Sequence, residues 1–379
     1  MSMLSLDELV AIRRDFHQHP ELAGEEKRSQ KVLLEWLERL GIEAKPLAGT
    51  GVVGLIRGAA DGPCIMLRAD MDALPVTDEK DVEYRSRQAG CMHACGHDAH
   101  MAILLGAASA LVDAPPSAGS VKLVFQPAEE QGAGAKAMIE SGVLEDPKVD
   151  VAIALHVWSP MPAGRAVARP GSIMASVDSF SMRVRGRSTH AARPEEGCDP
   201  IPVAAGIITA AQTLVSRKVA PYERAVLSFT SIHAGTAFNV IPETVEMKGT
   251  IRAQKSSVRK MLTEHLGQQA QHLAASMEAS MELSWSERLP VLENDADLIK
   301  LARDQAGALE LSDMEPLMVG EDFALFAERI PAAMLILGAG PKDPEKIIPH
   351  HHPRFDIDES VLPQGARWLA DCAQVYLQG

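Results

Sequence analysis

Four short and nearly continuous apolar runs constrain the fold of this chain more than any other feature. They cover residues 51–56, 64–67, 121–125 and 149–155. Such runs are typical of strands buried on both faces of a parallel sheet. Helical segments separate them, because apolar residues recur with helical spacing over 29–40 and 101–112. The pattern therefore predicts an α/β domain with a mixed, mostly parallel sheet flanked by helices.

The hydrophobic period changes near residue 178. Phe180, Met182 and Val184 alternate with polar residues, as in a strand with one buried face. From there the predicted elements follow the order β-α-β-β-α-β, which is that of a ferredoxin-like fold. The first pattern resumes after Pro290. We therefore predict a main domain from residues 1–177 and 290–379, interrupted by an inserted ferredoxin-like α+β domain at 178–289.

Charge and composition exclude several classes of protein. The formal net charge is -14 at pH 7, whereas nucleic-acid binding depends on clustered Lys and Arg. No apolar run reaches the roughly 18 residues of a membrane span, and the N-terminus lacks a signal-peptide pattern. The cysteines are five in number and scattered, which favours reduced thiols. We therefore expect a cytoplasmic protein with neither a nucleic-acid nor a membrane partner.

Metal-binding types of side chain follow the ends of the apolar runs. They are Asp70 and Asp72 after 64–67, Glu129 and Glu130 after 121–125, and His156 after 149–155. Because the ends of parallel strands meet at one crevice, we expect these side chains to lie close together. Adjacent side chains diverge, so one carboxylate of the Glu129–Glu130 pair can bind a metal while the other moves protons. Taken alone, such a pair is more commonly a solvated surface feature.

The segment Cys95-Gly96-His97 adds a thiol and an imidazole. The intervening glycine lets the backbone bend both side chains toward one point. Thiolate with imidazole suits zinc or a neighbouring transition metal. The same spacing is compatible with a buried thiol beside a capping histidine, or with a Cys/His nucleophilic pair.

Longer motifs occur along the chain, namely MHACGHDAHM from Met92, VFQPAEEQGAG from Val124, ALHVW from Ala154, STHAARPEEGCDPI from Ser188, FNVIPE from Phe238, GTIR from Gly249, GEDF from Gly320 and HHHPRFDIDE from His350. These motifs resemble the family of aminoacylases, hippurate hydrolases and indole-acetyl-amino-acid hydrolases, which are dinuclear metallo-amidohydrolases related to metallopeptidases. They occur in the family's order over nearly the whole chain.

The resemblance implies a metal site in a zinc-peptidase-like catalytic domain. Two divalent ions, of zinc, manganese, nickel or cobalt, would be bridged by Cys95. The remaining ligands implied by the resemblance are His97, Glu130, His156 and His351. His351 is chosen because it lies two residues before Pro353, with His350 and His352 as alternates. More distant relatives have a His-x-Asp motif where this chain has Asp70-Met71-Asp72, so Asp72 is expected to orient a ligand.

The resemblance also implies residue roles in catalysis. Glu129 would be the catalytic base, and His190 of the inserted domain would donate to the oxyanion. Asn239 and Arg252 would bind the substrate carboxylate. The inserted domain would act as a lid and dimerisation domain, so that Asn239 and His190 could serve the neighbouring subunit of a homodimer or higher oligomer.

The predicted reaction is hydrolysis of an N-acetyl, N-benzoyl or related N-acyl amino acid into a carboxylic acid and a free amino acid. A dipeptidase or exopeptidase using the same site is the alternative. Two further hypotheses are a non-catalytic binding protein with the same fold and an enzyme with Cys95 as nucleophile. The adjacent Glu129 disfavours the binding protein, because a structural metal site needs no free base.

Overall fold

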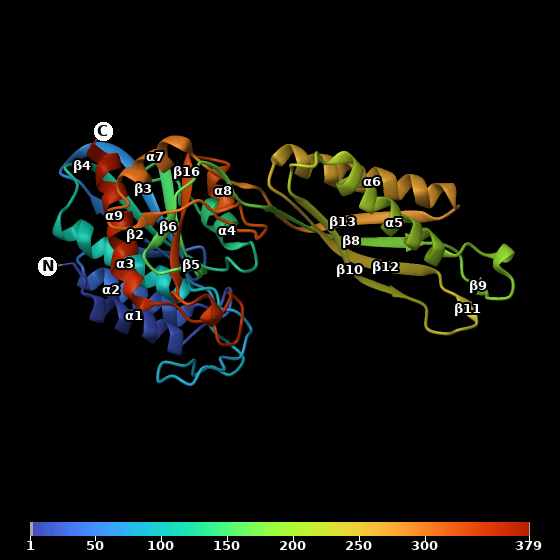
Figure 1. The fold of residues 1–379 in the computed structure, drawn as a ribbon, viewed down its shortest axis with the longest axis horizontal. Coiled ribbons are helices and arrows are strands. Elements are labelled where there is room, and N and C mark those ends of the chain that lie inside the picture. The colour runs from blue at the N-terminus through green and yellow to red at the C-terminus, as the bar shows by residue number, and fades with distance from the viewer. Residues whose placement is uncertain (1–2, 379) are drawn as a thin grey trace. The chain divides into compact units, whose positions relative to one another are not determined.

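The computed structural model describes residues 3–378 and divides into two compact units (Figure 1). The larger unit contains residues 3–171, 293–315 and 322–378, and the smaller unit contains residues 172–292 and 316–321. The sequence placed the boundaries at 177/178 and 289/290. Segment 316–321 belongs to the smaller unit although it follows the inserted stretch, because hydrogen bonds such as that from Leu317 N–H to Ile173 O join it there.

An eight-stranded sheet forms the centre of the larger unit, with strand order β1-β2-β4-β3-β5-β16-β6-β15. Its strands are β1 (Glu43–Leu47), β2 (Gly51–Arg57), β3 (Ala60–Asp70), β4 (Ala118–Gln126), β5 (Val151–Pro162), β6 (Arg165–Val167), β15 (Glu310–Leu311) and β16 (Ala332–Gly340). The four central strands β4, β3, β5 and β16 are parallel to one another, and β1, β2 and β6 add antiparallel pairings. The predicted mixed, mostly parallel sheet is confirmed.

Helices flank this sheet and bury its apolar strands. They are α1 (Leu6–Gln18), α2 (Lys27–Arg39), α3 (His97–Asp113), α4 (Gly134–Glu140), α7 (Ala296–Asp304), α8 (Ala324–Ala327) and α9 (Leu362–Gln378). Helix α3 lies against α1, α9 and strand β3 (Figure 1). Nearly all of its residues are buried, because it is apolar on every side.

The smaller unit has the predicted ferredoxin-like order of elements. They are β8 (Ser176–Arg185), α5 (Pro200–Lys218), β10 (Ala225–Ala234), β12 (Thr244–Ala253), α6 (Ser256–Ser276) and β13 (Ser280–Leu289). The antiparallel sheet has the order β10-β12-β8-β13, and α5 and α6 pack against it (Figure 1). Phe180, Met182 and Val184 of β8 point into this core, as their alternation predicts.

Short elements complete the chain. They are β7 (Gly171–Met174), β9 (Thr189–His190), β11 (Val240–Ile241) and β14 (Leu292–Asn294), with 3-10 turns at Pro194–Glu196, Pro344–Lys346 and Glu359–Val361. Among the described residues, no helix combines the length and the hydropathy that a bilayer crossing requires.

The expected side chains lie at or near the carboxyl ends of the central strands. Strand β3 ends at Asp70 and the neighbouring parallel strand β4 ends at Gln126, with Asp70 paired to Gln126. The expectation that His156 closes its strand is wrong. Strand β5 continues to Pro162, because its residues beyond His156 keep pairing with β16.

Candidate metal centre

Gly96 shapes the segment that carries the first two ligands. It has φ of 90° and is the N-cap residue of α3, which begins at His97. A Cβ at this position would lie 2.5 Å from Cγ2 of Val157, so a larger residue has neither the conformation nor the space. The resulting bend brings Sγ of Cys95 and a ring nitrogen of His97 within 4.8 Å of each other.

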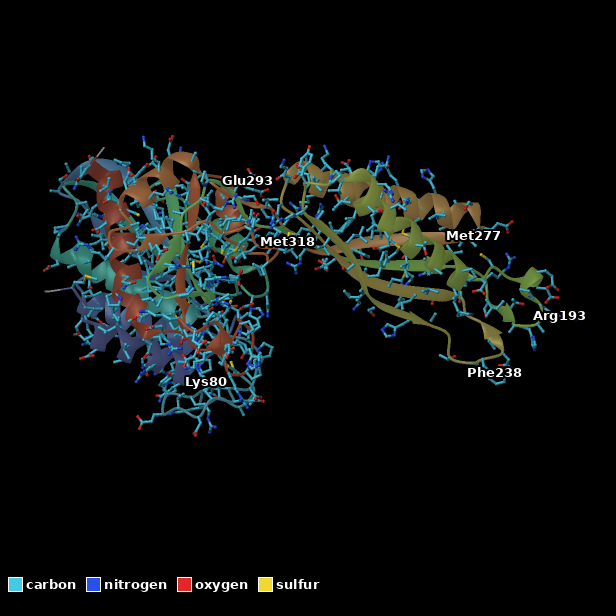
Figure 2. All side chains as sticks on the ribbon, viewed as in Figure 1. Lys80, Arg193, Phe238, Met277, Glu293 and Met318 are labelled. Atoms are coloured by element: carbon cyan, nitrogen blue, oxygen red, sulfur yellow. The ribbon has the colours of Figure 1, made fainter. Side chains whose placement is uncertain are left out.

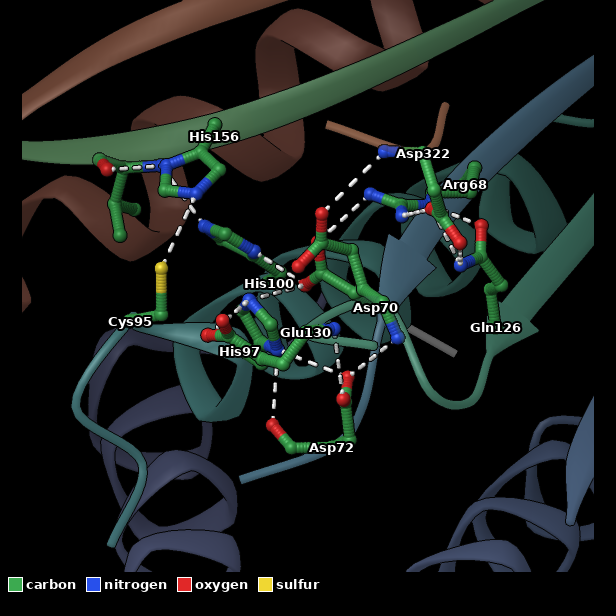
Figure 3. Close-up of polar contacts among 12 residues, drawn as sticks. Arg68, Asp70, Asp72, Cys95, His97, His100, Gln126, Glu130, His156 and Asp322 are labelled. Carbon is green, nitrogen blue, oxygen red and sulfur yellow. Dashed lines mark hydrogen bonds and ion pairs between the residues drawn. The ribbon is translucent and has the colours of Figure 1, made fainter. Parts of the chain in front are cut away.

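Two groups of possible metal ligands share Cys95. One contains Cys95, His97 and His156, and the other contains Cys95, Glu130 and His351, with the ligand atoms of each group within 4.8 Å of one another. Sγ of Cys95 lies 3.7 Å from Nε2 of His156 (Figure 3). Oε1 of Glu130 lies 3.9 Å from Nε2 of His97 and 3.6 Å from Nε2 of His351. The five residues named from the sequence are thus gathered around Cys95.

Both buried imidazoles are oriented by backbone carbonyl groups. Nδ1 of His97 lies 2.9 Å from the carbonyl oxygen of Asp72, and Nδ1 of His156 lies 2.6 Å from that of Val157. A proton on each Nδ1 leaves the lone pair of Nε2 facing the other ligands. This is how proteins commonly fix histidines that bind metals.

The spacing and bonding of these atoms fit a divalent ion. Nε2 of His97 and Oε1 of Glu130 are buried and have no hydrogen-bond partner among the described residues. Ligand atoms about 2.0–2.3 Å from one zinc-type ion are roughly 3.3–3.8 Å apart in a tetrahedral arrangement. Within each group the spacing falls in that range, at 3.7 Å between Cys95 and His156 and 3.6 Å between Glu130 and His351. A cation would supply the missing partner of both orphaned atoms.

Buried negative charge is concentrated at the same place. Burial raises the pKa of Glu130 to about 7, and Asp72 and Asp70 add to this effect while His97 opposes it. Burial, together with Glu130, raises the pKa of the Cys95 thiol well above its usual value. Without a cation, the raised pKa values therefore keep the Cys95 thiol protonated and the Glu130 carboxyl group partly protonated at neutral pH. Metal binding requires their deprotonated forms, so it should release protons.

His351 is the member of the three-histidine run that faces the ligands. It has φ of 65°, and its N–H donates to the carbonyl oxygen of Ala94 at 2.8 Å, which joins its loop to the Cys95 segment. His350 instead stacks on Trp158 with ring centroids 4.7 Å apart. His352 is exposed and accepts the N–H of Arg354 at 3.0 Å.

Glu129 and Glu130 lie in the segment 127–132 directly after β4. This segment turns at residues 129–132 and is called below the Glu129 turn. Ala128 has φ of 51°, a left-handed conformation that costs a residue with a Cβ about 1–2 kcal/mol. The N–H groups of Glu129 and Glu130 donate to the carboxylate of Asp72 at 3.1 and 3.0 Å. Asp72 thus fixes both the turn and His97 by direct hydrogen bonds, while its own carboxylate belongs to neither group that shares Cys95.

The Glu129 carboxylate lies beside the ligands. One of its oxygens is within 4.8 Å of the ligand atoms of His97 and Glu130. Oε1 of Glu129 also accepts the N–H of Asp322 at 3.4 Å. Glu129 is a member of neither group that shares Cys95, which suits a base rather than a second carboxylate ligand.

A buried network that sequence reasoning missed surrounds Arg68. Its guanidinium donates to Asp70 at 2.7 Å, to Gln126 at 2.9 Å and to Asp322 at 3.1 Å (Figure 3). The carboxylate of Asp322 also accepts the N–H of Ala135 at 2.9 Å. Asp322 lies in the GEDF motif, but no local pattern indicates that it would meet Arg68, 254 residues away.

His100 is a second residue without an expected role. Its Nδ1 lies 2.6 Å from Oδ1 of Asp70, and its Nε2 accepts the N–H of Val157 at 2.9 Å. Asp70, His97 and His100 also form a compact group of possible ligands. Because both nitrogens of His100 already have partners, it supports Asp70 and the strand that carries His156 rather than binding a metal itself.

The predicted substrate-binding residues belong to the smaller unit. His190 of β9 is exposed, and the N–H of Ala191 donates to the carbonyl oxygen of Asn239, which links the two segments. They lie at the end of this unit that Figure 2 marks with Phe238. Arg252 is near the C-terminal end of β12, away from Asn239, and its Nη1 lies 3.5 Å from the carbonyl oxygen of Met318. The structure therefore brings His190 and Asn239 together but not Arg252.

The fold and the shared-cysteine site together define a class of dinuclear metallohydrolase. The chain belongs to peptidase family M20/M25/M40, whose model matches residues 66–375, and it is therefore a hydrolase. It is 37% identical over 375 residues to an N-acetylcysteine deacetylase of Bacillus subtilis, with 98% of this chain and 97% of that protein covered. The IAA-amino acid hydrolase ILR1-like 2 of Arabidopsis thaliana is also 37% identical, with 98% and 86% covered.

Solved structures agree with this assignment. A dinuclear metal binding peptidase of the M20 family from Bacillus subtilis superposes with a TM-score of 0.87 at 35% identity, covering 98% of each chain. The relationship supports binding of divalent metal ions by this chain.

Proposed function

We propose that this protein is a metal-dependent amidohydrolase that cleaves the amide bond of N-acyl amino acids. The observation that carries the proposal is the pair of ligand groups that share Cys95 next to the separate carboxylate of Glu129. The N-acetylcysteine deacetylase and the IAA-amino acid hydrolase among its relatives support an N-acyl amino acid as the substrate.

Two divalent ions would be held by these residues. Cys95, His97 and His156 would bind one, and Cys95, Glu130 and His351 would bind the other. When bound, the ions supply Lewis acids that polarise the scissile carbonyl group and lower the pKa of the attacking water. A thiolate with imidazoles and one carboxylate suits zinc, manganese, nickel or cobalt.

Glu129 would move the protons of the reaction. Its carboxylate takes a proton from the attacking water and then delivers it to the departing nitrogen, which leaves as an amine. The two proton transfers balance, because the proton that water loses is gained by the leaving nitrogen when the C–N bond breaks. The N–H of Asp322, 3.4 Å from Oε1, helps to orient the carboxylate.

His190, Asn239 and Arg252 would recognise the substrate. His190 would donate to the oxyanion, and Asn239 and Arg252 would bind the α-carboxylate. Within one chain, Thr244 and Arg252 are separated along β12 by roughly 27 Å, and Asn239 lies next to the β9–β11 pair beyond the Thr244 end of β12 (Figure 1). One carboxylate cannot contact both from the same chain. We therefore propose a homodimer in which Asn239 and His190 serve the partner's site, with the smaller unit as lid and dimerisation domain.

Mixing two inactive variants tests this exchange. Glu129→Gln removes the base of the chain that carries it, whereas His190→Ala removes a donor from the partner's site. If the sites are shared, mixed dimers contain one intact site, and an equal mixture should recover about a quarter of the wild-type activity. A mixture as inactive as its components, although subunits have exchanged, would exclude a shared site.

A substrate screen tests the reaction itself. Metal-stripped protein is reloaded with zinc or manganese and assayed with N-acetylcysteine, an N-benzoyl amino acid and an IAA-amino acid conjugate. The proposal predicts turnover that a chelator abolishes. Turnover that persists in fully metal-stripped protein would contradict it.

A peptidase using the same site is the second candidate, because the solved relative from Bacillus subtilis is described as a peptidase. A dipeptide in the same screen separates the two functions. A dipeptide hydrolysed much faster than every N-acyl amino acid would favour the peptidase.

We also propose a cytoplasmic location, which is supported by five cysteines that form no disulfide bond.

A further inference from the structure

Three consecutive amide groups of the Glu129 turn are held by two buried carboxylates. The N–H of Ala128 donates to Oε1 of Glu26 at 2.9 Å, and the next two N–H groups donate to Asp72. The acceptors come from distant parts of the chain, because Glu26 precedes Ala128 by 102 residues. The position of the turn is thus set by long-range contacts rather than by a helix or a strand.

The side chain of Glu26 does not cap the helix that begins after it. It is the N-cap residue of α2, yet its side chain makes no capping hydrogen bond. The residue is fully buried, and its second oxygen accepts the hydroxyl of Thr50 at 2.5 Å. Burial raises the pKa of this carboxyl group, so an ionised side chain is unfavourable here unless it has specific partners. The hydroxyl of Thr50 and the amide of Ala128 are two of those partners, beside the nearby backbone amides of Gly24 and Glu26 itself.

Ala128 is the part of the turn that requires support. Its φ of 51° lies in the left-handed region, which residues other than glycine rarely adopt. Strained backbone of this kind persists where the surroundings fix it, and it is concentrated at functional sites. Because Glu129 follows directly, a return of Ala128 to negative φ would redirect its carboxylate.

We propose that Glu26 is a positioning residue that holds Ala128 in its left-handed conformation and thereby directs Glu129 toward the attacking water. This inference rests on the proposed function, in which Glu129 is the base. Glu26 acts through the backbone of the turn, since its contacts are with Thr50 and Ala128 rather than with any of the proposed metal ligands.

Two substitutions of Glu26 test whether its side chain is needed as a hydrogen-bond acceptor or for its negative charge. Glu26→Ala removes the acceptor, whereas Glu26→Gln retains an oxygen for the amide of Ala128. In zinc-loaded enzyme with N-acetylcysteine, Glu26→Ala should lower kcat at least about tenfold with KM changed less than about threefold. Glu26→Gln should stay within about threefold of the wild type in both constants. Bound zinc, measured by mass spectrometry, should be equal in all three proteins.

Glu21 offers a matched control at the same end of α2. Its carboxylate accepts the N–H groups of Arg28 and Ser29 at 2.9 and 2.8 Å. Glu21→Ala therefore removes a similar pair of contacts without touching the turn, and it should lower the Tm while leaving kcat unchanged. An equal loss of kcat in both alanine variants, or no loss in Glu26→Ala, would overturn the proposal.

Substitutions of Ala128 give an independent test if Glu26→Ala does not fold. Glycine adopts positive φ readily, whereas a β-branched residue does so rarely. Ala128→Gly should therefore keep the wild-type kcat, and Ala128→Val should lower it with zinc content unchanged. Equal kcat in these two variants would contradict a role for the left-handed conformation.

The crystal structure of Glu26→Gln or Glu26→Ala separates this inference from the proposed function. If the wild type hydrolyses none of the substrates, the proposed function fails, but the backbone of Ala128 can still be examined. A negative φ at Ala128 in Glu26→Ala supports the positioning role. An unchanged φ near the observed 51° in that variant excludes it.

Discussion

Replacing Asp72 with asparagine should weaken both the fold and the reaction. Asp72 is 1% exposed, and its carboxylate accepts the N–H groups of Glu129 and Glu130 at 3.1 and 3.0 Å. An amide keeps one oxygen for one of these groups and turns an NH2 group toward the other. One buried hydrogen bond to a charged acceptor is lost, and a donor then faces a donor. We expect the free energy of unfolding to fall by about 2–4 kcal/mol.

The catalytic effect of this change should be larger than its effect on stability suggests. A displacement of about 1 Å in a reacting group can lower the rate roughly 100-fold. We therefore expect kcat to fall about 100-fold at saturating zinc, because the Glu129 turn loses one of its two anchors in Asp72. Urea unfolding measures the stability, and hydrolysis of N-acetylcysteine measures kcat.

Asp78 provides the control for this experiment. Its carboxylate is also buried, at 8% exposure, and accepts the N–H groups of Lys80 and Ser86 at 3.0 Å each. Asp78→Asn should cost a similar amount of stability but leave kcat within about twofold of the wild type. The reasoning is refuted if Asp72→Asn retains the wild-type kcat, or if both variants lose it equally.

Three further predictions concern stability and reactivity. Burial lowers the pKa of His93 to about 3, so the free energy of unfolding of metal-free protein should fall as the pH falls from 6.5 toward 3. His93→Leu should reduce the slope of this free energy against pH by about 1.2 kcal/mol per pH unit near pH 5.5, as urea titrations can measure. Arg13→Ala should lower the free energy of unfolding by about 3–5 kcal/mol, because it leaves Asp98 buried without its guanidinium partner at 2.8 Å. Bound zinc should slow alkylation of Cys95 but not of the half-buried Cys198, as peptide mass spectrometry can measure; equal protection of both thiols would argue against Cys95 as a ligand.

Four of the five proposed ligands have a local sequence signal, whereas His351 is chosen only from the family resemblance. The runs 64–67 and 121–125 end next to acidic residues, and parallel strands of one sheet bring such ends together. Gly96 indicated the bend that brings Cys95 and His97 together. The same signals gave the wrong limit for β5, because Trp158 and the residues after it continue the strand without a continuous apolar run.

The supporting residues could not be predicted in this way. Glu26 contacts Ala128 across 102 residues and Arg68 contacts Asp322 across 254 residues, and a pattern read over a short window contains no information about such partners. Glu26 in particular has the sequence context of an ordinary helix start. The left-handed conformation of Ala128 has no signal either, since glycine is the residue that normally marks it.

We expect Cys95 to be shared by two metal ions beside an uncoordinated Glu129. Anomalous diffraction from crystals of the zinc-loaded protein tests it most directly. We predict two zinc peaks per chain, each about 2.3 Å from Sγ of Cys95, with no zinc bound to Glu129. A single peak, or two peaks of which one is remote from Cys95, would contradict the account.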